Sequence, residues 1–422
     1  MLLPFVIRMT STPDIPNPTP SHTRLMQLDV LRGVAILMVL LRHSSPKWAL
    51  LPYYYAGPLS RIMLFVGNIG WTGVDLFFVL SGFLIGGLLF REIKKTGRLD
   101  VRRFFIRRGL KIWPAYFFFL LVVLILASRE IGFRAAFHAL IPNFIHLQNY
   151  LGSPHGITWS LAVEEHFYLA LPLFLLVIIP RRRDDGSMPA IPIAAAVLIV
   201  VCTALRFTNW NRPFDMYIQQ TPTHLRIDGL FFGVLLAYLF HIKPALLARI
   251  ARHRLALLVL GAALLAPMGF YDVPDHRWIW TIGYTMIYVG YGCILIACLF
   301  SPPGDLLGNL LASRPAAVLA WVGVFSYSIY LWQFEISYIP IHKWVLRRLP
   351  HHPLSLYWLV GTAIYLLAAI LGGALLARIV EFPVLKLRDR LFPARADAVP
   401  VAPAAANEAE SSTLLPVVSA SN

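Results

Sequence analysis

Ten stretches of mostly apolar residues alternate along the chain with short polar or charged segments. They cover about residues 28–46, 69–90, 110–127, 158–179, 189–207, 226–242, 255–271, 278–300, 316–339 and 354–380. Each stretch is close to the roughly 20 residues that an α-helix needs to cross a bilayer. The pattern therefore predicts an all-α, polytopic integral membrane protein with about ten transmembrane helices, which form one domain over residues 25–392.

The two ends of the chain lack this pattern. Residues 1–24 are rich in Pro, Ser and Thr, and residues 393–422 include the run VPVAPAAANEAESS. Both compositions are typical of disordered segments. The apolar start, MLLPFVI, is too short and too interrupted to be a signal peptide.

Composition and charge agree with a membrane protein and predict its orientation. Of the 422 residues, 58% are hydrophobic and 14% are charged, unlike an ordinary soluble domain. Lys and Arg outnumber Asp and Glu by 37 to 21, and the excess gathers in alternate loops, over residues 91–111, 181–183, 243–254 and 386–390. Basic loops stay in the cytoplasm, so we expect an inner-membrane protein with both termini cytoplasmic. Three cations in an outward loop break the pattern: Lys343, Arg347 and Arg348.

Two classes of partner are not indicated. No nucleic-acid-binding motif accompanies the positive charge, so the lipid bilayer, and not nucleic acid, is the expected partner. The three cysteines, Cys202, Cys293 and Cys298, lie in apolar runs without metal-ligand spacing. We expect them to be packing residues, with no metal site and no disulfide.

The first apolar stretch carries three ionisable side chains, Asp29, Arg32 and His43. Such groups are costly at membrane depth, so each needs a partner, a water-filled cavity or a chemical task. His43 follows Arg32 by eleven residues, which places both on nearly the same helix face, about 16 Å apart along the axis. Histidine titrates near neutral pH, so His43 is a candidate general base. It is equally consistent with a helix-end residue near the lipid headgroups.

The second apolar stretch contains Asp75 and Ser81 in the run GVDLFFVLSGFL. A carboxylate there can pair with Arg32 or orient His43. Glycines in the same run allow helices to approach closely.

Paired ionisable residues begin two further stretches. Glu164 and Glu165 lie about 100° apart on a helix, so at most one of them should share a cavity with the other polar groups. Arg226 and Asp228 are too close in sequence to share a helical face, so each should have a partner elsewhere. Interhelical salt bridges explain any one of these groups. Together with a histidine, they indicate a buried reaction chamber or a transport path.

The order and spacing of these residues resemble the membrane-bound acyltransferase family 3 over about residues 25–390. The residues that match the family's motifs are Asp29, Arg32 and His43; Gly73, Val74, Asp75, Phe77, Phe78, Ser81, Gly82 and Phe83; Arg107, Arg108, Lys111 and Pro114; Trp159, Ser160, Glu164, Phe167 and Tyr168; Arg226, Asp228, Gly229 and Gly233; and Glu381 and Pro383. Two positions differ from the pattern. Lys111 stands where arginine is usual, and Gln333 closes SYSIYLWQ where the family often has histidine, so a second imidazole is absent. The chain is too short for the hydrolase-like domain fused to some members, so we expect a stand-alone type.

The resemblance implies transfer of an acyl group, typically acetyl, from acyl-CoA to a hydroxyl of a carbohydrate acceptor: a surface polysaccharide, a lipid-linked sugar or a glycosylated metabolite. Acyl-CoA is then a donor substrate, and no bound cofactor is implied. The implied donor-binding residues are Arg32, Arg107, Arg108 and Lys111. His43 would be the general base, with Asp75 or Glu164 fixing its tautomer. Candidates for structural or substrate-orienting roles are Asp29, Ser81, Trp159, Ser160, Tyr168, Arg226, Asp228 and Glu381.

Two other functions stay open from the residues. A secondary transporter or flippase of a sugar or acylated lipid also places polar groups at mid-depth, but it predicts inverted internal repeats, which are not visible in the sequence. A non-enzymatic assembly or sensor role makes His43 dispensable. Trp71, Trp159 and Tyr168 are consistent either with stacking on a sugar or with interfacial positions at helix ends.

Overall fold

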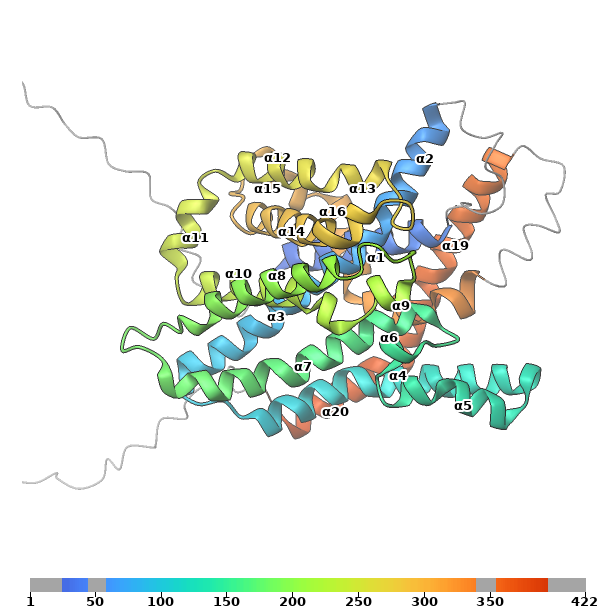
Figure 1. The fold of residues 1–422 in the computed structure, drawn as a ribbon, viewed down its shortest axis with the longest axis horizontal. Helices are drawn as coiled ribbons and strands as arrows, with labels where there is room; N and C mark the ends of the chain where they lie inside the picture. The colour runs from blue at the N-terminus through green and yellow to red at the C-terminus, as the bar shows by residue number, and fades with distance from the viewer. Residues whose placement is uncertain (1–24, 45–57, 339–353, 394–422) are drawn as a thin grey trace, which may run out of the picture.

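The computed structural model describes residues 25–44, 58–338 and 354–393. In this part of the chain every regular element is a helix (Figure 1), as the apolar pattern predicts. The terminal segments that the composition marks as disordered, residues 1–24 and 394–422, lie outside the described residues, as does the loop with Lys343, Arg347 and Arg348.

The α-helices of the described residues follow one another along the chain. The longer ones are α1 (Met26–Ser44), α2 (Pro58–Ile69), α3 (Gly73–Thr96), α4 (Val101–Ile131), α5 (Phe133–Phe144), α7 (Trp159–Ile178), α8 (Ala190–Phe207), α10 (Ile227–His241), α11 (Pro244–Ala251), α12 (Arg254–Leu265), α14 (Tyr284–Leu299), α16 (Arg314–Val324), α19 (Leu354–Leu376) and α20 (Phe382–Leu391). The shorter ones are α6 (Gln148–Leu151), α9 (Met216–Gln219), α13 (Pro267–Phe270), α15 (Leu306–Leu311) and α17 (Ser326–Trp332). The described residues also include the 3₁₀ turns η1 (Gly70–Thr72), η2 (Gly156–Thr158), η3 (Ile179–Arg181) and η4 (Thr223–Leu225), and the π-helical turns η5 (Ile279–Gly283), η6 (Gln333–Tyr338) and η7 (Ala377–Glu381). Most of the bundle runs along one axis, with α4 and α5 as a hairpin at one end (Figure 1).

The lengths of the helices confirm a polytopic membrane protein. Six helices in the described residues are long and apolar enough to cross a membrane: Arg61–Thr96, Val101–Ile131, Gly156–Arg181, Ala190–Phe207, Ile279–Leu299 and Val360–Leu391. The number rises to eight if each of two bent helix pairs is counted as one span. These pairs are Ile227–His241 with Pro244–Ala251 and Arg314–Val324 with Ser326–Glu335. The predicted stretches also include α1, which carries charged side chains, and the shorter apolar helix Arg254–Phe270. The count of ten spans stays a prediction.

Helix α4 is longer than the sequence pattern predicts. It begins at Val101, not near residue 110, because the Asp100 carboxylate accepts a hydrogen bond from the Arg103 backbone N–H and caps the helix. The basic motif of residues 107–111 therefore lies on the helix, and not in a loop before it. At its other end the chain turns at Gly132 into α5, which packs back along α4. The apolar pattern does not predict this hairpin.

Glycines bring α3 and α10 into close contact. A Cβ atom at Gly82 would lie 1.9 Å from the carbonyl oxygen of Leu230, and one at Gly233 would lie 2.3 Å from the carbonyl oxygen of Val79. Only glycine fits where two helix backbones touch in this way. The contact fixes which face of α3 points toward α10.

We expect Gly233→Ala to destabilise the protein by about 1–3 kcal/mol, because the two helices must separate to admit the methyl group. Thermal unfolding in detergent measures this loss. Gly229→Ala, one turn earlier on α10, is the matched control, since its Cβ would lie 3.4 Å from Tyr288 Cδ1 in ordinary contact. Equal melting temperatures for the two variants would contradict the close packing of α3 and α10.

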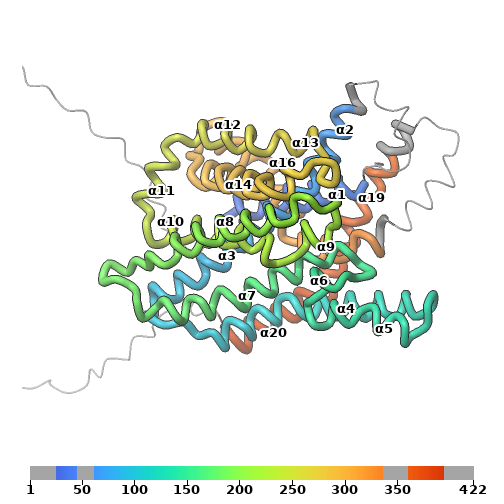
Figure 2. Tube along the Cα trace, in the orientation of Figure 1, coloured from blue at the N-terminus to red at the C-terminus, as the bar shows by residue number. Residues whose placement is uncertain are grey.

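Helix α1 lies among elements from distant parts of the chain. It contacts α3, α16, α17 and α19 (Figure 2). A Cβ at Gly33 would lie 2.0 Å from the carbonyl oxygen of Leu319, so the backbones of α1 and α16 touch. The chain then bends by 62° between α16 and the segment that starts with α17. This bend brings Ser326 to Arg32 and places α17 beside α1.

Candidate functional site

A cavity of about 1020 Å³ lies between α1, α3, α4, α7, α17 and α20. Its charged lining residues are Asp29, Arg32, Arg91, Glu92, Lys95, Arg103, Arg107, Arg108, Lys111, Glu164, Glu165, Glu381 and Arg388. Apolar side chains of α3 form another wall: Val74, Phe77, Phe78, Leu80, Phe83, Leu84, Ile85 and Leu88. Cations exceed carboxylates among these residues by eight to five, which suits an anionic ligand.

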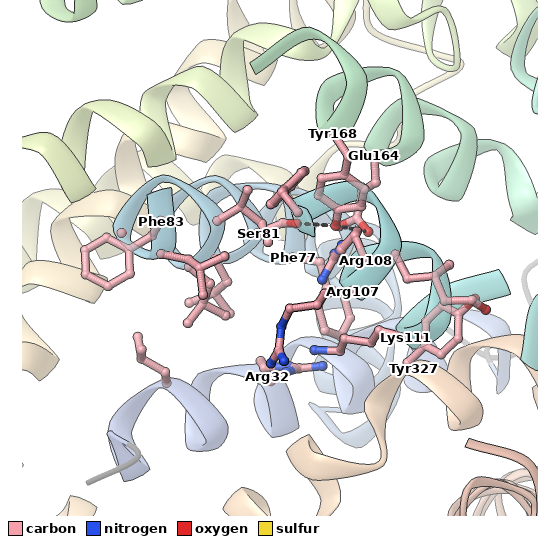
Figure 3. A pocket seen from close by; sticks show the side chains of 18 of the residues that line it. Arg32, Phe77, Ser81, Phe83, Arg107, Arg108, Lys111, Glu164, Tyr168 and Tyr327 are labelled. Atoms are coloured by element: carbon pink, nitrogen blue, oxygen red, sulfur yellow. Dashed lines mark hydrogen bonds between the residues drawn. The ribbon is translucent and has the colours of Figure 1, made fainter. Parts of the chain in front are cut away.

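The four cations predicted to bind the donor all line this cavity (Figure 3): Arg32, Arg107, Arg108 and Lys111. Spacings of three and four residues place the three α4 cations on one side of that helix. Arg32 reaches the cavity from α1 and donates from Nη2 to the Ser326 hydroxyl at 3.1 Å. The Arg108 guanidinium stacks over the Tyr168 ring at 3.9 Å. Two helices that are far apart in sequence therefore build one cationic wall.

Arg107 also contacts the C-terminal helix. It donates from Nη2 to Asp389 Oδ1 at 3.2 Å and from Nη1 to the carbonyl oxygen of Phe392. Arg103, one turn earlier, donates to the carbonyl oxygen of Pro393. Helix α20 is thereby held against α4 and closes one side of the cavity.

Glu164 belongs to a hydrogen-bonded chain on the cavity wall. Tyr168 donates its hydroxyl to Glu164 Oε2 at 2.9 Å, so it accepts from the Ser81 hydroxyl at 2.6 Å. Glu165 lines the same cavity and accepts from the Trp113 indole at 3.3 Å. The prediction that at most one glutamate shares the cavity is wrong, because the cavity extends from α3 to α4 across the start of α7. Glu381 lines it as well, and accepts from the Ser328 hydroxyl at 3.0 Å.

Asp75 contacts neither Arg32 nor His43. Its Oδ1 accepts from Arg226 Nη2 at 2.5 Å, and both side chains are buried. The prediction that Asp75 pairs with Arg32 or orients His43 is therefore wrong. Asp75 lies seven residues before Gly82, so it shares the face of α3 that packs against α10.

Arg226 and Asp228 have separate partners, as their spacing predicts. Asp228 accepts from Arg206 Nη2, which lies 2.6 Å from each carboxylate oxygen. The Arg226 guanidinium stacks on the Tyr284 ring at 3.7 Å and lies 5.4 Å from the Trp159 ring. Trp159 is buried in this cluster and is absent from the cavity lining.

Ser160 and Tyr330 lie on the cavity wall where α7 meets α17. The Tyr330 hydroxyl donates to the carbonyl oxygen of Ile157 at 2.6 Å, so it accepts from the Ser160 hydroxyl at 2.7 Å. These contacts join α17 to η2 and to the start of α7.

His43 lies outside the cavity lining, eleven residues along α1 from Arg32. Its Nδ1 is 2.8 Å from Gln333 Oε1, and its ring lies 4.8 Å from the Phe334 ring. Within the described part of the chain no carboxylate hydrogen-bonds the imidazole. Gln333 therefore occupies the place that the sequence pattern assigned to Asp75 or Glu164.

Comparison with known proteins places the chain in a family. A profile described as an acyltransferase domain matches residues 26–378, most of the 422 residues. The chain belongs to this acyltransferase family. The resemblance noted from the motifs is thereby confirmed.

Several relatives of this acyltransferase-family chain carry names that refer to peptidoglycan or O-acetyl transfer. A Bacillus subtilis protein named as a candidate peptidoglycan O-acetyltransferase, YrhL, is 30% identical over 339 residues, which cover 75% of this chain and 49% of the relative. The O-acetyltransferase OatA of Staphylococcus aureus is 25% identical over 76% of this chain and 52% of its own length. The peptidoglycan O-acetyltransferase OatA of Listeria monocytogenes is 26% identical over 75% of this chain and 50% of its own length. The chain thus spans about half the length of these relatives, and no solved structure matches it significantly.

Sequence reasoning about this acyltransferase-family chain did not assign roles to Tyr330 and Glu165, and it noted Gln333 only as a missing imidazole. Tyrosine in an apolar span resembles a packing residue. The sequence feature that links Tyr330 to Gln333 is their three-residue spacing, which places both on neighbouring turns of one helix.

Proposed function

We propose that this protein is a membrane O-acetyltransferase that moves an acetyl group from acetyl-CoA to a hydroxyl of a carbohydrate, such as a peptidoglycan glycan. The proposal depends on one observation: in this acyltransferase-family chain, Arg32 and the cations of α4 line the same cavity. Two of the relatives have names that mention peptidoglycan, which supports the carbohydrate acceptor.

The chain is proposed to lie in the inner membrane of the cell. The cavity is proposed to open toward the cytoplasm. Arg91 and Lys95 line the cavity at the end of α3, in the most basic segment of the chain. Basic segments usually remain cytoplasmic, so both termini are proposed to lie inside as well. Acetyl-CoA is made there, so its phosphates would meet the cationic wall first.

The proposed reaction uses His43 as the general base. Its Nε2 removes the proton from the acceptor hydroxyl while that oxygen attacks the thioester carbonyl carbon. The carbon–sulfur bond then breaks, the CoA thiolate leaves, and the imidazolium returns the proton to the sulfur. The products are a sugar acetate ester and CoA with a free thiol.

The path of the donor follows from where His43 lies. The cavity reaches Arg32 on α1, whereas His43 lies eleven residues further along that helix, outside the cavity. The thioester arm must therefore extend beyond the cavity lining to reach His43. A carbohydrate acceptor would approach His43 from the opposite side of the membrane.

Arg108 is the α4 cation best placed to bind a phosphate. It lines the cavity, and its buried Nε has no hydrogen-bond partner in the described part of the chain. A guanidinium in this state retains a free donor for an anionic oxygen. Stacking on Tyr168 fixes the plane of that donor.

We expect Arg108→Lys to raise the KM for acetyl-CoA about tenfold, because lysine keeps the charge but loses the paired donors and the stacking surface. Initial rates of the purified protein over a range of acetyl-CoA concentrations measure this change. Arg102→Lys is the matched control on the exposed side of α4, outside the cavity lining. An unchanged KM for Arg108→Lys would exclude a phosphate contact at this side chain.

A further inference from the structure

We infer that Gln333 is a positioning residue that holds the His43 imidazole with its proton on Nδ1, so that Nε2 is free to act as the base. The inference rests on the proposed function, since it assigns the tautomer and the orientation of the proposed catalytic group. It starts from the hydrogen bonds of the Gln333 amide.

The contact with Tyr330 fixes the orientation of that amide. Gln333 Nε2 lies 3.1 Å from the backbone carbonyl oxygen of Tyr330. A carbonyl oxygen can only accept, so the NH₂ group must face Tyr330. The amide oxygen therefore faces the opposite way, toward His43.

The amide oxygen of Gln333 fixes the tautomer of His43. Gln333 Oε1 lies 2.8 Å from His43 Nδ1 and accepts from the Tyr365 hydroxyl at 3.0 Å. An amide oxygen has two lone pairs and no proton, so both neighbours must donate to it. Nδ1 therefore carries the hydrogen of the neutral ring, and the free lone pair is on Nε2.

Packing of the surrounding helices keeps this arrangement rigid. Gln333 is fully buried and begins the π-helical turn η6, an irregularity that often occurs at functional sites. Helix α19, which supplies Tyr365, touches the α17 backbone, since a Cβ at Gly373 would lie 2.6 Å from Ile329 Cα. Gln333 is thus held from α17 and α19, and a 180° rotation of the amide would place its oxygen against the Tyr330 carbonyl oxygen and lose that hydrogen bond. The ring of Phe334 limits the tilt of the imidazole from one side.

The role resembles that of a carboxylate beside a catalytic histidine, with one difference. A neutral amide fixes the tautomer and the orientation, but it does not neutralise the imidazolium that forms during the reaction. The contribution of Gln333 is therefore expected in kcat, whereas donor binding in the cationic cavity is left unchanged.

The test is Gln333→Met, which fills similar volume without an acceptor oxygen. We expect kcat for acetyl transfer to fall about 10- to 100-fold with an unchanged KM for acetyl-CoA. Gln333→Glu restores an acceptor oxygen and should recover most of the lost kcat. Thr362→Val is the matched control on α19, because the buried Thr362 hydroxyl has no hydrogen-bond partner in the described residues, and it should keep the parent kcat.

The outcomes separate this inference from the proposed function. A folded Gln333→Met protein with the parent kcat, beside an inactive His43→Gln protein, would overturn the positioning role alone. An active His43→Gln protein would overturn the proposed base as well. If Gln333→Met fails to fold, the folded Gln333→Glu variant tests the positioning role instead. A kcat close to that of the parent supports the role, and an inactive enzyme contradicts it.

Discussion

Replacing His43 with glutamine is expected to lower the rate of acetyl transfer by about 100-fold or more, the usual contribution of a positioned general base. An amide side chain cannot accept the proton from the acceptor hydroxyl. The fold should be retained, because the neighbouring Arg42 keeps its 3.2 Å ion pair with Asp272, which holds this end of α1 in place. Release of free CoA thiol from acetyl-CoA, in the presence of a carbohydrate acceptor, measures the rate.

The control for this variant is His138→Gln on α5, where the side chain is exposed and outside the cavity lining. It should keep the parent rate. A His43→Gln protein that inserts in the membrane and turns over acetyl-CoA at the parent rate would remove His43 from the mechanism.

The largest effect on stability is expected at the buried pair of Arg206 and Asp228, both about 1% exposed. Asp228→Leu leaves the guanidinium without its counter-ion in the helix bundle, and breaking such a pair costs about 3–5 kcal/mol. Arg206 also donates to the carbonyl oxygen of Leu225 at 2.6 Å from Nη2, but this contact does not compensate the charge. Thermal unfolding in detergent, together with the yield of folded protein, measures the loss.

Two comparisons separate the lost charge partner from the altered packing. The double variant Arg206→Met with Asp228→Leu removes both charges and should recover much of the stability. Lys243→Met breaks an exposed pair with Asp185 at 2.9 Å and should leave the melting temperature close to that of the parent. A stable Asp228→Leu protein, or a double variant as unstable as the single one, would contradict this role of the pair.

Sequence patterns predicted the features of this chain that depend on neighbouring residues. The apolar periodicity predicted the helices. The spacing of Arg226 and Asp228 predicted that the two side chains have separate partners. The length of α4 could not be predicted from hydropathy, because a capping bond from Asp100 adds polar residues to the start of the helix. Hydropathy also could not separate α5 from the loop that follows α4.

The long-range pairings in the site were harder to predict. Whether Asp75 meets Arg32 or Arg226 depends on which face of α3 packs against α10, and glycine contacts in three dimensions decide that. The partner of His43 is separated from it by 290 residues. Glutamine is neutral, so a search for charged side chains does not identify Gln333 as the partner of His43. The cation cluster was easier, because helical spacing alone places Arg107, Arg108 and Lys111 on one side of α4.

The proposed reaction of this chain is the transfer of acetyl groups from acetyl-CoA to a carbohydrate hydroxyl. The most direct measurement gives the purified protein, in liposomes, acetyl-CoA labelled in the acetyl group together with soluble peptidoglycan fragments. The predicted result is an alkali-labile acetyl ester on the sugar, an equal amount of free CoA thiol, and neither product with His43→Gln. Movement of unmodified sugar across the bilayer without consumption of acetyl-CoA would contradict acetyl transfer and indicate a transporter.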